Sequence, residues 1–474
     1  MAISEQDYLA RDAVGLAMMI QGGQISAAEA LEAALARSAK VNPKINAITM
    51  DLADRARREV AARAPTGLLA GVPFLLKDLG PRLAGTPTTD SCKLYVDDVA
   101  ETDTPLTSLY KAAGLTIFGK TNTPELGLEP ITEPVMFGPT RNPWDLSRTS
   151  GGSSGGAAAA VAAGIVPAAH ASDGGGSIRI PASCCGLFGL KPSRGLVSAA
   201  PKDEGWGGFS CGHVVSHSVR DSAILLDIAG RPQPGDPYWT APPAEPFLAA
   251  AERDPTSLRI AFTTAAFSSS GLDPECAQAV RDAAKLCESL GHRVEEVDPP
   301  IDRAALAAAG VVIAASVAAD LDTVALKRGR PIDEAEVEPI TWTSYQRGRT
   351  ISGSAYIQAV RGAHGLGRAV AGFFRTYDIL ICATLGSPAV PVGYLHGEPL
   401  DLAGYAGRLF AFMPNTQAFN VTGQPAASIP LAMSAGGLPI GVQFVARQAE
   451  DALLLSLAGQ LERAAPWAGR RAVI

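Results

Sequence analysis

Hydrophobic and polar positions alternate along this chain with two different periods. Short apolar runs of strand length are separated by longer stretches with the three-to-four-residue apolar spacing of helices. The strand-like runs lie at residues 71–77, 115–119, 258–263, 293–297, 378–383 and 441–446. Strands that alternate with helices predict an α/β fold, with a large, largely parallel or mixed central sheet covered by helices on both faces.

Local signals mark where several of the helices begin and end. Ser26 and Glu29 have the spacing of a capping box, which opens a helix expected to end near residue 40, before Pro43. Pro105 suits the first position of another helix, which Gly114 can end. Further helices are predicted over residues 51–63 and 273–290 and from residue 449 onward.

The longest weakly polar run, residues 304–319, consists mostly of alanine. It is shorter than the roughly 20 residues that a membrane span needs, so a buried helix is the better interpretation. The first twelve residues are acidic where a signal peptide would be basic and then apolar. We therefore expect a cytoplasmic protein without membrane contact.

Composition excludes other classes of protein. Hydrophobic residues make up 47% of the 474 positions and charged residues 18%, which supplies a large core and argues against disorder. The net charge of −7 comes without a prominent Lys/Arg cluster, so no nucleic-acid partner is expected. Seven scattered cysteines lack zinc-site spacing and predict reduced thiols.

Two glycine–serine runs are the most unusual local feature: GGSSGG at 151–156 and ASDGGGSIRIP at 171–181. Neither carries the lysine of a P-loop or the spacing of a dinucleotide fingerprint, which argues against a phosphate cradle. Ser153 and Ser154 each match G-x-S-x-G, the pattern of a nucleophile elbow. That turn follows an apolar central strand, whereas residues 141–149 are polar and turn-prone, so an elbow is disfavoured.

A serine nucleophile would need a base, because its hydroxyl is weakly nucleophilic. His170, His213 and His217 are nearest in sequence, but isolated histidines usually belong to the core or the surface. Lys77 ends the apolar run GVPFLL, and burial would lower its pKa and let it act as a base. The alternative is a strand-end lysine that extends to solvent, and the spacing leaves both possibilities open.

Several motifs together resemble the amidase signature family of serine hydrolases. They are GVPFLLKD, TNTPELG, GGSSGG, DGGGSIRIPASCCGLFGLKPS and FNVTGQPA. The resemblance covers nearly the whole chain and is weakest over residues 240–375. It implies the amidase signature fold and a triad in which Ser177 is the nucleophile, Ser153 a serine after a cis peptide bond, and Lys77 the base.

The same resemblance implies further roles around the triad. The backbone amides of an oxyanion hole would be those of Gly174, Gly175, Gly176 and Ser177. Asp173 and Arg179 match positions that hold this loop in shape, and Ser154 is expected to support it by hydrogen bonding. The implied reaction is amide hydrolysis through an acyl-enzyme, with no metal or organic cofactor.

Within the family, the flanks of these motifs look most like bacterial amidases of the 6-aminohexanoate-cyclic-dimer hydrolase and aryl acylamidase types. The expected substrates are small, fairly apolar linear or cyclic amides and anilides, with carbamates and esters as further candidates, as in a urethanase. The expected pocket residues are Gly127, Leu128, Ile131, Trp206, Trp342, Tyr345, Phe412 and Asn415.

The resemblance implies one amidase domain over residues 1–474. Its expected parts are N-terminal helices (1–65), a catalytic core (66–235), a variable substrate-lining insertion (240–375) and the C-terminal part of the core (376–474). A monomer or homodimer is expected. Two alternatives stay open: a glutaminase-type subunit of a tRNA-dependent amidotransferase, and a catalytically silent scaffold of the same fold.

Overall fold

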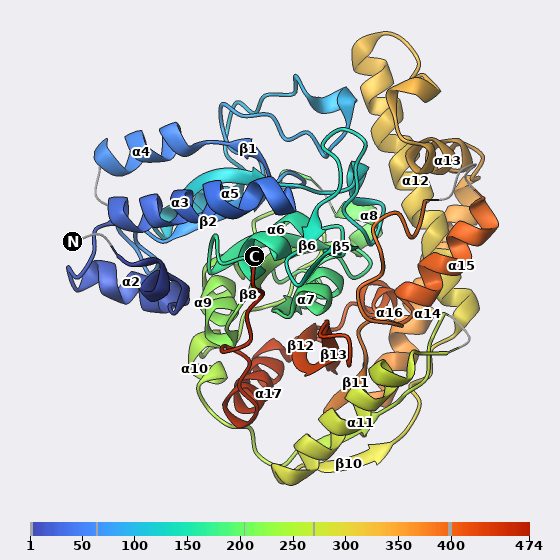
Figure 1. Cartoon of the computed structure of the whole chain (residues 1–474). Helices are drawn as coiled ribbons and strands as arrows, with labels where there is room; N and C mark the ends of the chain where they lie inside the picture. The colour runs from blue at the N-terminus through green and yellow to red at the C-terminus, as the bar shows by residue number, and fades with distance from the viewer. Residues whose placement is uncertain (1–2, 63–64, 203, 269–270, 397–400) are drawn as a thin grey trace.

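The largest element is a mixed β-sheet (Figure 1), in a computed structural model that describes residues 3–62, 65–202, 204–268, 271–396 and 401–474. Its eight strands follow the order β10 (Arg293–Glu296), β9 (Arg259–Phe262), β11 (Ile379–Ala383), β13 (Pro439–Ala446), β12 (Ala426–Met433), β7 (Phe188–Lys191), β8 (Cys211–Ser216) and β6 (Ala168–Asp173). β10, β9 and β11 are parallel to one another, and each later neighbour is antiparallel. The prediction of a large mixed sheet is confirmed.

Helices cover both faces of this sheet. Successive side chains of a strand point to opposite faces, and in β11 Ile379 and Ile381 enter one apolar cluster while Leu380 and Cys382 enter another. The first cluster includes α11 (Pro274–Ser289) and α17 (Asp451–Ala464), and the second includes α12 (Arg303–Arg328), α14 (Gly353–Phe373) and α16 (Gln417–Thr422). The central strand β11 is therefore buried on both faces, as is typical of an α/β fold.

A smaller sheet carries the first catalytic candidate. Its order is β1 (Ile48–Asp51), β3 (Thr116–Thr121), β2 (Pro73–Lys77), with β2 parallel to β3. β2 also packs beside β6 of the large sheet, and the Lys77 amide donates to His170 Nδ1 at 3.4 Å. The end of β2 therefore lies against the strand that leads into the second glycine–serine run.

The remaining elements connect and cover these sheets. The N-terminal ones are α1 (Glu5–Leu9), α2 (Ala13–Gln21), α3 (Ala27–Ile45), α4 (Ala53–Ala62), η1 (Lys93–Tyr95) and α5 (Pro105–Ala112). The central ones are η2 (Glu125–Gly127), β4 (Arg141–Asn142), β5 (Asp145–Thr149), α6 (Gly155–Ala162), α7 (Arg179–Cys185), α8 (Gly205–Gly208), α9 (Val219–Ala229) and α10 (Phe247–Ala251). The last are η3 (Glu334–Glu336), α13 (Pro339–Arg349) and α15 (Leu402–Phe412).

The helix opened by the capping box is longer than predicted. Both hydrogen bonds of the box are present at Ser26, but α3 continues through Pro43 to residue 45 instead of ending near residue 40. The side chain of Asn42 accepts from the amides of Ala47 and Ile48 at 2.8 and 2.9 Å, which satisfies donors just past the helix. A proline in the last turn is therefore tolerated here.

Residues 141–149 form β4 and β5, a separate antiparallel pair outside the central sheet. This agrees with the expectation that the segment is too polar for a central strand. GGSSGG therefore follows a peripheral strand and leads directly into α6.

The alanine-rich run forms α12, which is longer and more exposed than expected. Among the described residues α12 is the one helix long and apolar enough to cross a membrane by length and composition alone, and 39% of its most apolar window is buried. Here α12 packs against α13 and α14 (Figure 1). The predicted buried helix is thus a half-buried one.

The segment expected as an insertion, residues 240–375, has two structural roles. Its first part contributes β9, β10 and α11 to the large sheet and its cover. In its second part, α12 and α13 form an apolar cluster of their own that includes Leu126 and Leu128 from the catalytic core. One continuous stretch of chain therefore supplies the strands at one edge of the large sheet and an apolar cluster that contacts the catalytic core.

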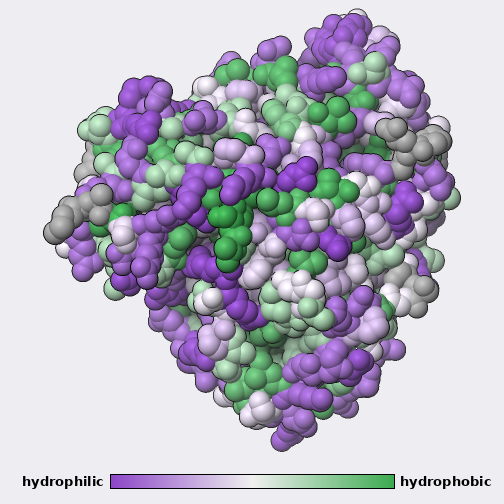
Figure 2. Space-filling view, in the orientation of Figure 1, coloured by the Kyte–Doolittle hydropathy of each residue, from purple (hydrophilic) through white to green (hydrophobic). Residues whose placement is uncertain are grey.

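The surface is hydrophilic over much of the face shown in Figure 2, including the N-terminal helices and the outer end of the α12–α13 pair. Large exposed hydrophobic residues such as Met18, Val135, Trp239 and Leu326 come from separate elements. All seven cysteines are free and buried, which agrees with the prediction of thiols rather than disulfides.

The contact between α12 and α13 depends on Gly348, where an added Cβ would collide with the backbone oxygen of Ala314. We expect Gly348→Ala to destabilise the protein by roughly 1–3 kcal/mol through overpacking. Gly362→Ala on α14 is the matched control, since a Cβ there meets nothing within 4 Å, and it should be neutral or stabilising by up to about 1 kcal/mol. Urea unfolding followed by circular dichroism measures both; equal shifts would contradict the close approach.

Candidate active site

Lys77 is the last residue of β2 and is fully buried. Its Nζ lies 2.7 Å from Ser153 Oγ and 3.0 Å from Ser172 Oγ. The alternative of a lysine that extends to solvent is wrong, because every residue of β2 is buried.

Burial changes the charge state of this lysine. Desolvation lowers the pKa of Lys77 to about 7, although Asp90 and Asp173 act in the opposite direction. A lysine with an ordinary pKa is neutral in only about one molecule in 3,000 at pH 7, so this shift makes a neutral amine abundant. The side chain can therefore accept a proton from the hydroxyl it contacts.

The glycines of GGSSGG allow the backbone to approach its neighbours closely. A Cβ on Gly152 would lie 2.6 Å from the backbone of Ile131, and one on Gly156 would collide with the backbone at Asn122. The peptide bond between Gly152 and Ser153 is cis. These contacts place Ser153 between the Ile131 segment and Lys77.

Ser154 is committed to a structural role. Its Oγ donates to the carbonyl of Ser172 at 3.1 Å and accepts from the amide of Ser172 at 3.2 Å. Its own amide donates to the carbonyl of Ser177 at 3.3 Å. Ser154 thus joins the two glycine–serine runs, and its hydroxyl is fully buried.

The nearby histidines do not supply a base. Burial lowers the pKa values of His170, His213 and His217 to about 3. His213 Nε2 contacts the hydroxyl of Ser222 at 2.8 Å, and His217 Nε2 contacts the carbonyl of Val161 at 3.1 Å. The nucleophile-elbow hypothesis therefore finds no support at either serine.

Ser177 lies between β6 and α7 and keeps 9% of its surface exposed, more than Ser153 at 2%. In the same loop, the amide of Gly176 donates to Asp173 Oδ1 at 2.7 Å. The amides of Gly174, Gly175 and Ser177 donate to no acceptor among the described residues. Of the four amides expected in an oxyanion hole, Gly176 is thus engaged by Asp173 and three are available.

A buried ion pair fixes this loop. Arg179 donates to Asp173 through Nε at 2.9 Å and Nη2 at 2.8 Å, and both side chains are fully buried. The pKa of Asp173 is lowered to about 2, because the Arg179 guanidinium and the Asn420 amide outweigh desolvation. The carboxylate stays charged and holds the amides of Gly176 and Ile178.

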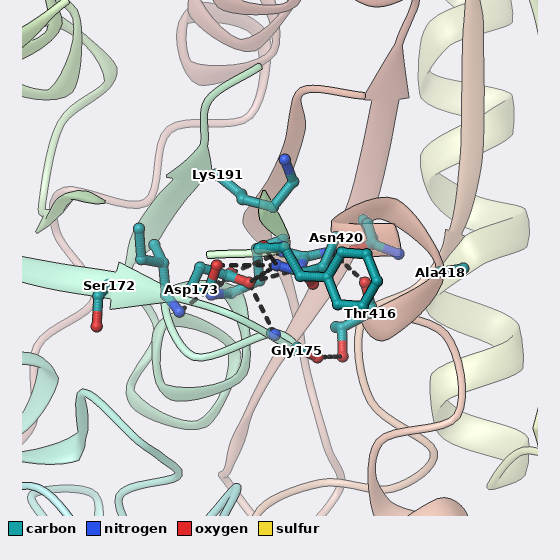
Figure 3. Close-up of polar contacts among 12 residues, drawn as sticks. Ser172, Asp173, Gly175, Lys191, Thr416, Ala418 and Asn420 are labelled. Atoms are coloured by element: carbon teal, nitrogen blue, oxygen red, sulfur yellow. Dashed lines mark hydrogen bonds and ion pairs between the residues drawn. The ribbon is translucent and has the colours of Figure 1, made fainter. Parts of the chain in front are cut away.

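The pair is anchored to segments far along the chain (Figure 3). Asn420 donates to both the carbonyl and the carboxylate of Asp173 at 2.8 Å, and Thr416 Oγ1 donates to the carbonyl of Gly175 at 2.7 Å. Arg179 reaches Gln443 Oε1 of β13 at 2.6 Å. The side chain of Ser172 points away from this network in Figure 3 and reaches Lys77 instead.

This arrangement brings two serines, a lysine whose pKa is lowered to about 7 and unpaired amides to one place. The profile of the family described as Amidase matches residues 29–455. The chain belongs to the amidase signature family. This amidase is accordingly an enzyme that hydrolyses amide C–N bonds.

Individual relatives resemble it along their whole length. A 6-aminohexanoate-cyclic-dimer hydrolase of Paenarthrobacter ureafaciens is 38% identical over 475 residues, which cover 97% of this chain and 96% of the relative. The solved structure of a 6-aminohexanoate cyclic dimer hydrolase complexed with substrate matches with a TM-score of 0.93 at 38% identity, covering 98% of this chain and 99% of that chain. A bacterial aryl acylamidase matches with a TM-score of 0.86 at 28% identity, covering 97% and 99%.

Some predicted pocket residues of the amidase lie at the site. A Cβ on Gly127 would be 3.3 Å from Ser153 Oγ, and one on Gly174 would be 2.8 Å from the ring of Trp206. Ile131 is fully buried behind Gly152. Leu128 is partly buried in the α12–α13 cluster.

The remaining predicted pocket residues lie in an apolar cluster or in the core. Trp342 and Tyr345 pack together at 5.6 Å within the α12–α13 cluster. Phe412 and Asn415 are fully buried, so neither presents surface to a ligand in this structure. The side-chain Nδ2 of Asn415 already donates to the carbonyls of Ala265 and Ala383, at 3.3 and 3.1 Å.

Four residues of the site were not singled out from the sequence: Ser172, Thr416, Asn420 and Gln443. Asn420 lies inside the motif FNVTGQPA, which was a signal for it. Gln443 lies in a strand with no motif, so only the fold brings it to Arg179. Ser172 lies inside the run ASDGGGSIRIP, directly before Asp173, so this run was a signal for it.

Breaking the buried ion pair should be costly. Arg179→Leu leaves Asp173 charged and unpaired in the interior, and we expect a loss of roughly 3–5 kcal/mol in the free energy of unfolding. The control is Arg253→Leu, which removes an exposed pair with Glu245 whose side chains are 64% and 45% accessible and should cause no measurable change. Urea denaturation compares the two; a small, equal effect would mean that the pair does not hold the loop.

Proposed function

We propose that this amidase cleaves small, fairly apolar amides through a triad of Ser177, Ser153 and Lys77. The single observation that carries the proposal is the 2.7 Å contact between Lys77 Nζ and Ser153 Oγ in a fully buried position. A hydroxyl both donates and accepts, so Ser153 can pass a proton from Ser177 to a neutral Lys77.

Acylation follows from this relay. Ser177 Oγ attacks the amide carbonyl carbon while its proton moves to Ser153 and the proton of Ser153 moves to Lys77. The carbonyl electron pair shifts onto oxygen, where the available amides of Gly174, Gly175 and Ser177 can donate to it. The C–N bond then breaks, and the leaving nitrogen takes the proton back from Lys77 through Ser153.

Deacylation uses the same groups in reverse. Water loses a proton to the relay and adds to the acyl carbon. Ser177 then leaves with the proton that the relay returns to it. The net reaction converts amide and water into acid and amine. The loop needs no movement during these steps, because Asp173 and Arg179 already fix its backbone. Preorganised donors of this kind are worth on the order of 10²–10³ in rate each.

The apolar character of the surroundings supports the substrate class. The ring of Trp206 lies against Gly174, and Leu128 belongs to an apolar cluster beside Gly127. The relatives named as a cyclic-dimer hydrolase and an aryl acylamidase support linear or cyclic amides and anilides, with carbamates and esters as further substrates.

A fluorophosphonate probe followed by mass mapping tests the nucleophile. We expect an adduct on Ser177 that is lost in Lys77→Ala, and we expect Ser177→Ala to reduce amide turnover by about 10⁴-fold or more without loss of fold. Ser154→Ala is the matched control and should keep the adduct on Ser177.

The other outcomes separate the alternatives. An adduct on Ser154, or retained turnover in Ser177→Ala, would refute the triad. Glutaminase activity together with a co-purifying partner would favour the amidotransferase subunit. An unreactive Ser177 and no turnover of any amide or ester would favour a silent scaffold.

The pH dependence tests the base. Lys77 must be neutral to accept a proton, so kcat/KM should rise with pH and level off above the lowered pKa of about 7. The profile is obtained by measuring the hydrolysis of one uncharged anilide between pH 5 and pH 9. A rate that falls steadily above neutrality would exclude a lysine base.

A further inference from the structure

Asp90 is held beside the triad by its backbone. Its amide donates to the carbonyl of Asp78 at 3.0 Å, and its own carbonyl accepts from the amide of Leu126 at 2.9 Å. Asp78 directly follows Lys77, and Leu126 directly precedes Gly127, which contacts Ser153. Asp90 is therefore fixed between the strand that ends in the lysine and the turn that touches the relay serine.

The carboxylate of Asp90 is unpaired in the part of the chain that the structure describes. Among the described residues it accepts no hydrogen bond, and no Lys, Arg or His nitrogen there forms an ion pair with it. The neighbouring Asp78, in contrast, accepts from the amide of Thr89 at 3.2 Å and lies 3.7 Å from Lys120 Nζ. Asp90 keeps part of its surface exposed, so its unpaired carboxylate near Lys77 is open to an incoming ligand.

The charges around Asp90 have both signs, and Lys202 has the largest effect among them on the pKa of its carboxyl group. Its charge acts on Lys77 more strongly than that of Asp173. Lys202, Asp78 and Asp320 are its other charged neighbours. The residue keeps part of its surface exposed, while burial of its carboxyl group raises its pKa to about 6. At pH 8 Asp90 is therefore ionised while Lys77 is neutral.

The relay also defines the side of the scissile bond on which Asp90 lies. Lys77 and Ser153 return the proton to the leaving nitrogen, so the amine portion of the substrate leaves on the side of Lys77. We propose that Asp90 binds a protonated amino group on this amine portion, so that the amidase prefers amides of diamines. This inference rests on the proposed triad and adds an ionic contact to the otherwise apolar pocket.

The test compares two amides of butanoic acid: N-(4-aminobutyl)butanamide and N-pentylbutanamide, in which a methyl group replaces the ammonium. Both give the same acyl-enzyme, so the ratio of their kcat/KM values reports recognition of the amine portion. At pH 8 we expect the wild type to prefer the charged amide by about tenfold or more, as for hydrogen bonds to charged groups. In Asp90→Asn this ratio should fall to near one.

Asn is a suitable replacement because it adopts the positive φ of 48° that Asp90 has. Asp97→Asn is the control, since it removes an exposed charge from the same loop and should leave the ratio unchanged. A wild type without preference, or an Asp90→Asn variant that keeps it, overturns the proposal.

A second measurement on the wild type does not depend on any variant. Pentylamine, a cation at pH 8, should inhibit competitively with about tenfold or greater potency relative to uncharged 1-pentanol, and equal inhibition overturns the proposal. Failure of the proposed function has a different signature: neither amide is cleaved and the fluorophosphonate leaves Ser177 unlabelled.

Discussion

The buried ion pair between Asp173 and Arg179 is the constraint on which the site depends. One carboxylate holds two loop amides, and one guanidinium reaches α16 and β13. Because both side chains are fully buried, neither charge can turn to water if the other is removed. The pair therefore makes the loop around Ser177 inseparable from the packing of the large sheet.

The same interior determines the chemistry of Lys77. Two hydroxyls, of Ser153 and Ser172, are its side-chain partners, and no carboxylate among the described residues pairs with it within 4 Å. Neutral partners leave desolvation as the main influence on the lysine, so its pKa falls. A carboxylate in direct contact would have kept it charged and unable to act as a base.

Much of the fold followed from local signals in the sequence. α5 begins at Pro105 and α11 covers residues 274–289, close to the helices predicted from the sequence. The ordered motifs predicted Lys77, Ser153 and Ser177 as a group because each motif carries a specific residue type, and the structure places the lysine in contact with Ser153.

Features set by distant packing could not be predicted in this way. Gln443 and Arg179 are 264 positions apart, and no local pattern marks such a pair. The aromatic and polar character of Phe412 and Asn415 suggested pocket residues, yet it is equally compatible with the core positions they occupy. The engagement of the Gly176 amide by Asp173 depends on loop geometry, which glycine content alone does not determine.

The long separation of the loop's anchors has a consequence for synthesis on the ribosome. When residue 200 has emerged, the nascent chain already contains both serines and the lysine. Thr416, Asn420 and Gln443 are still to be translated, so the backbone of Gly175 and the charges of Asp173 and Arg179 lack the groups that hold them. The loop around Ser177 thus gains its full set of contacts only when the last strands of the large sheet join it, and the growing polypeptide carries an incomplete loop until then.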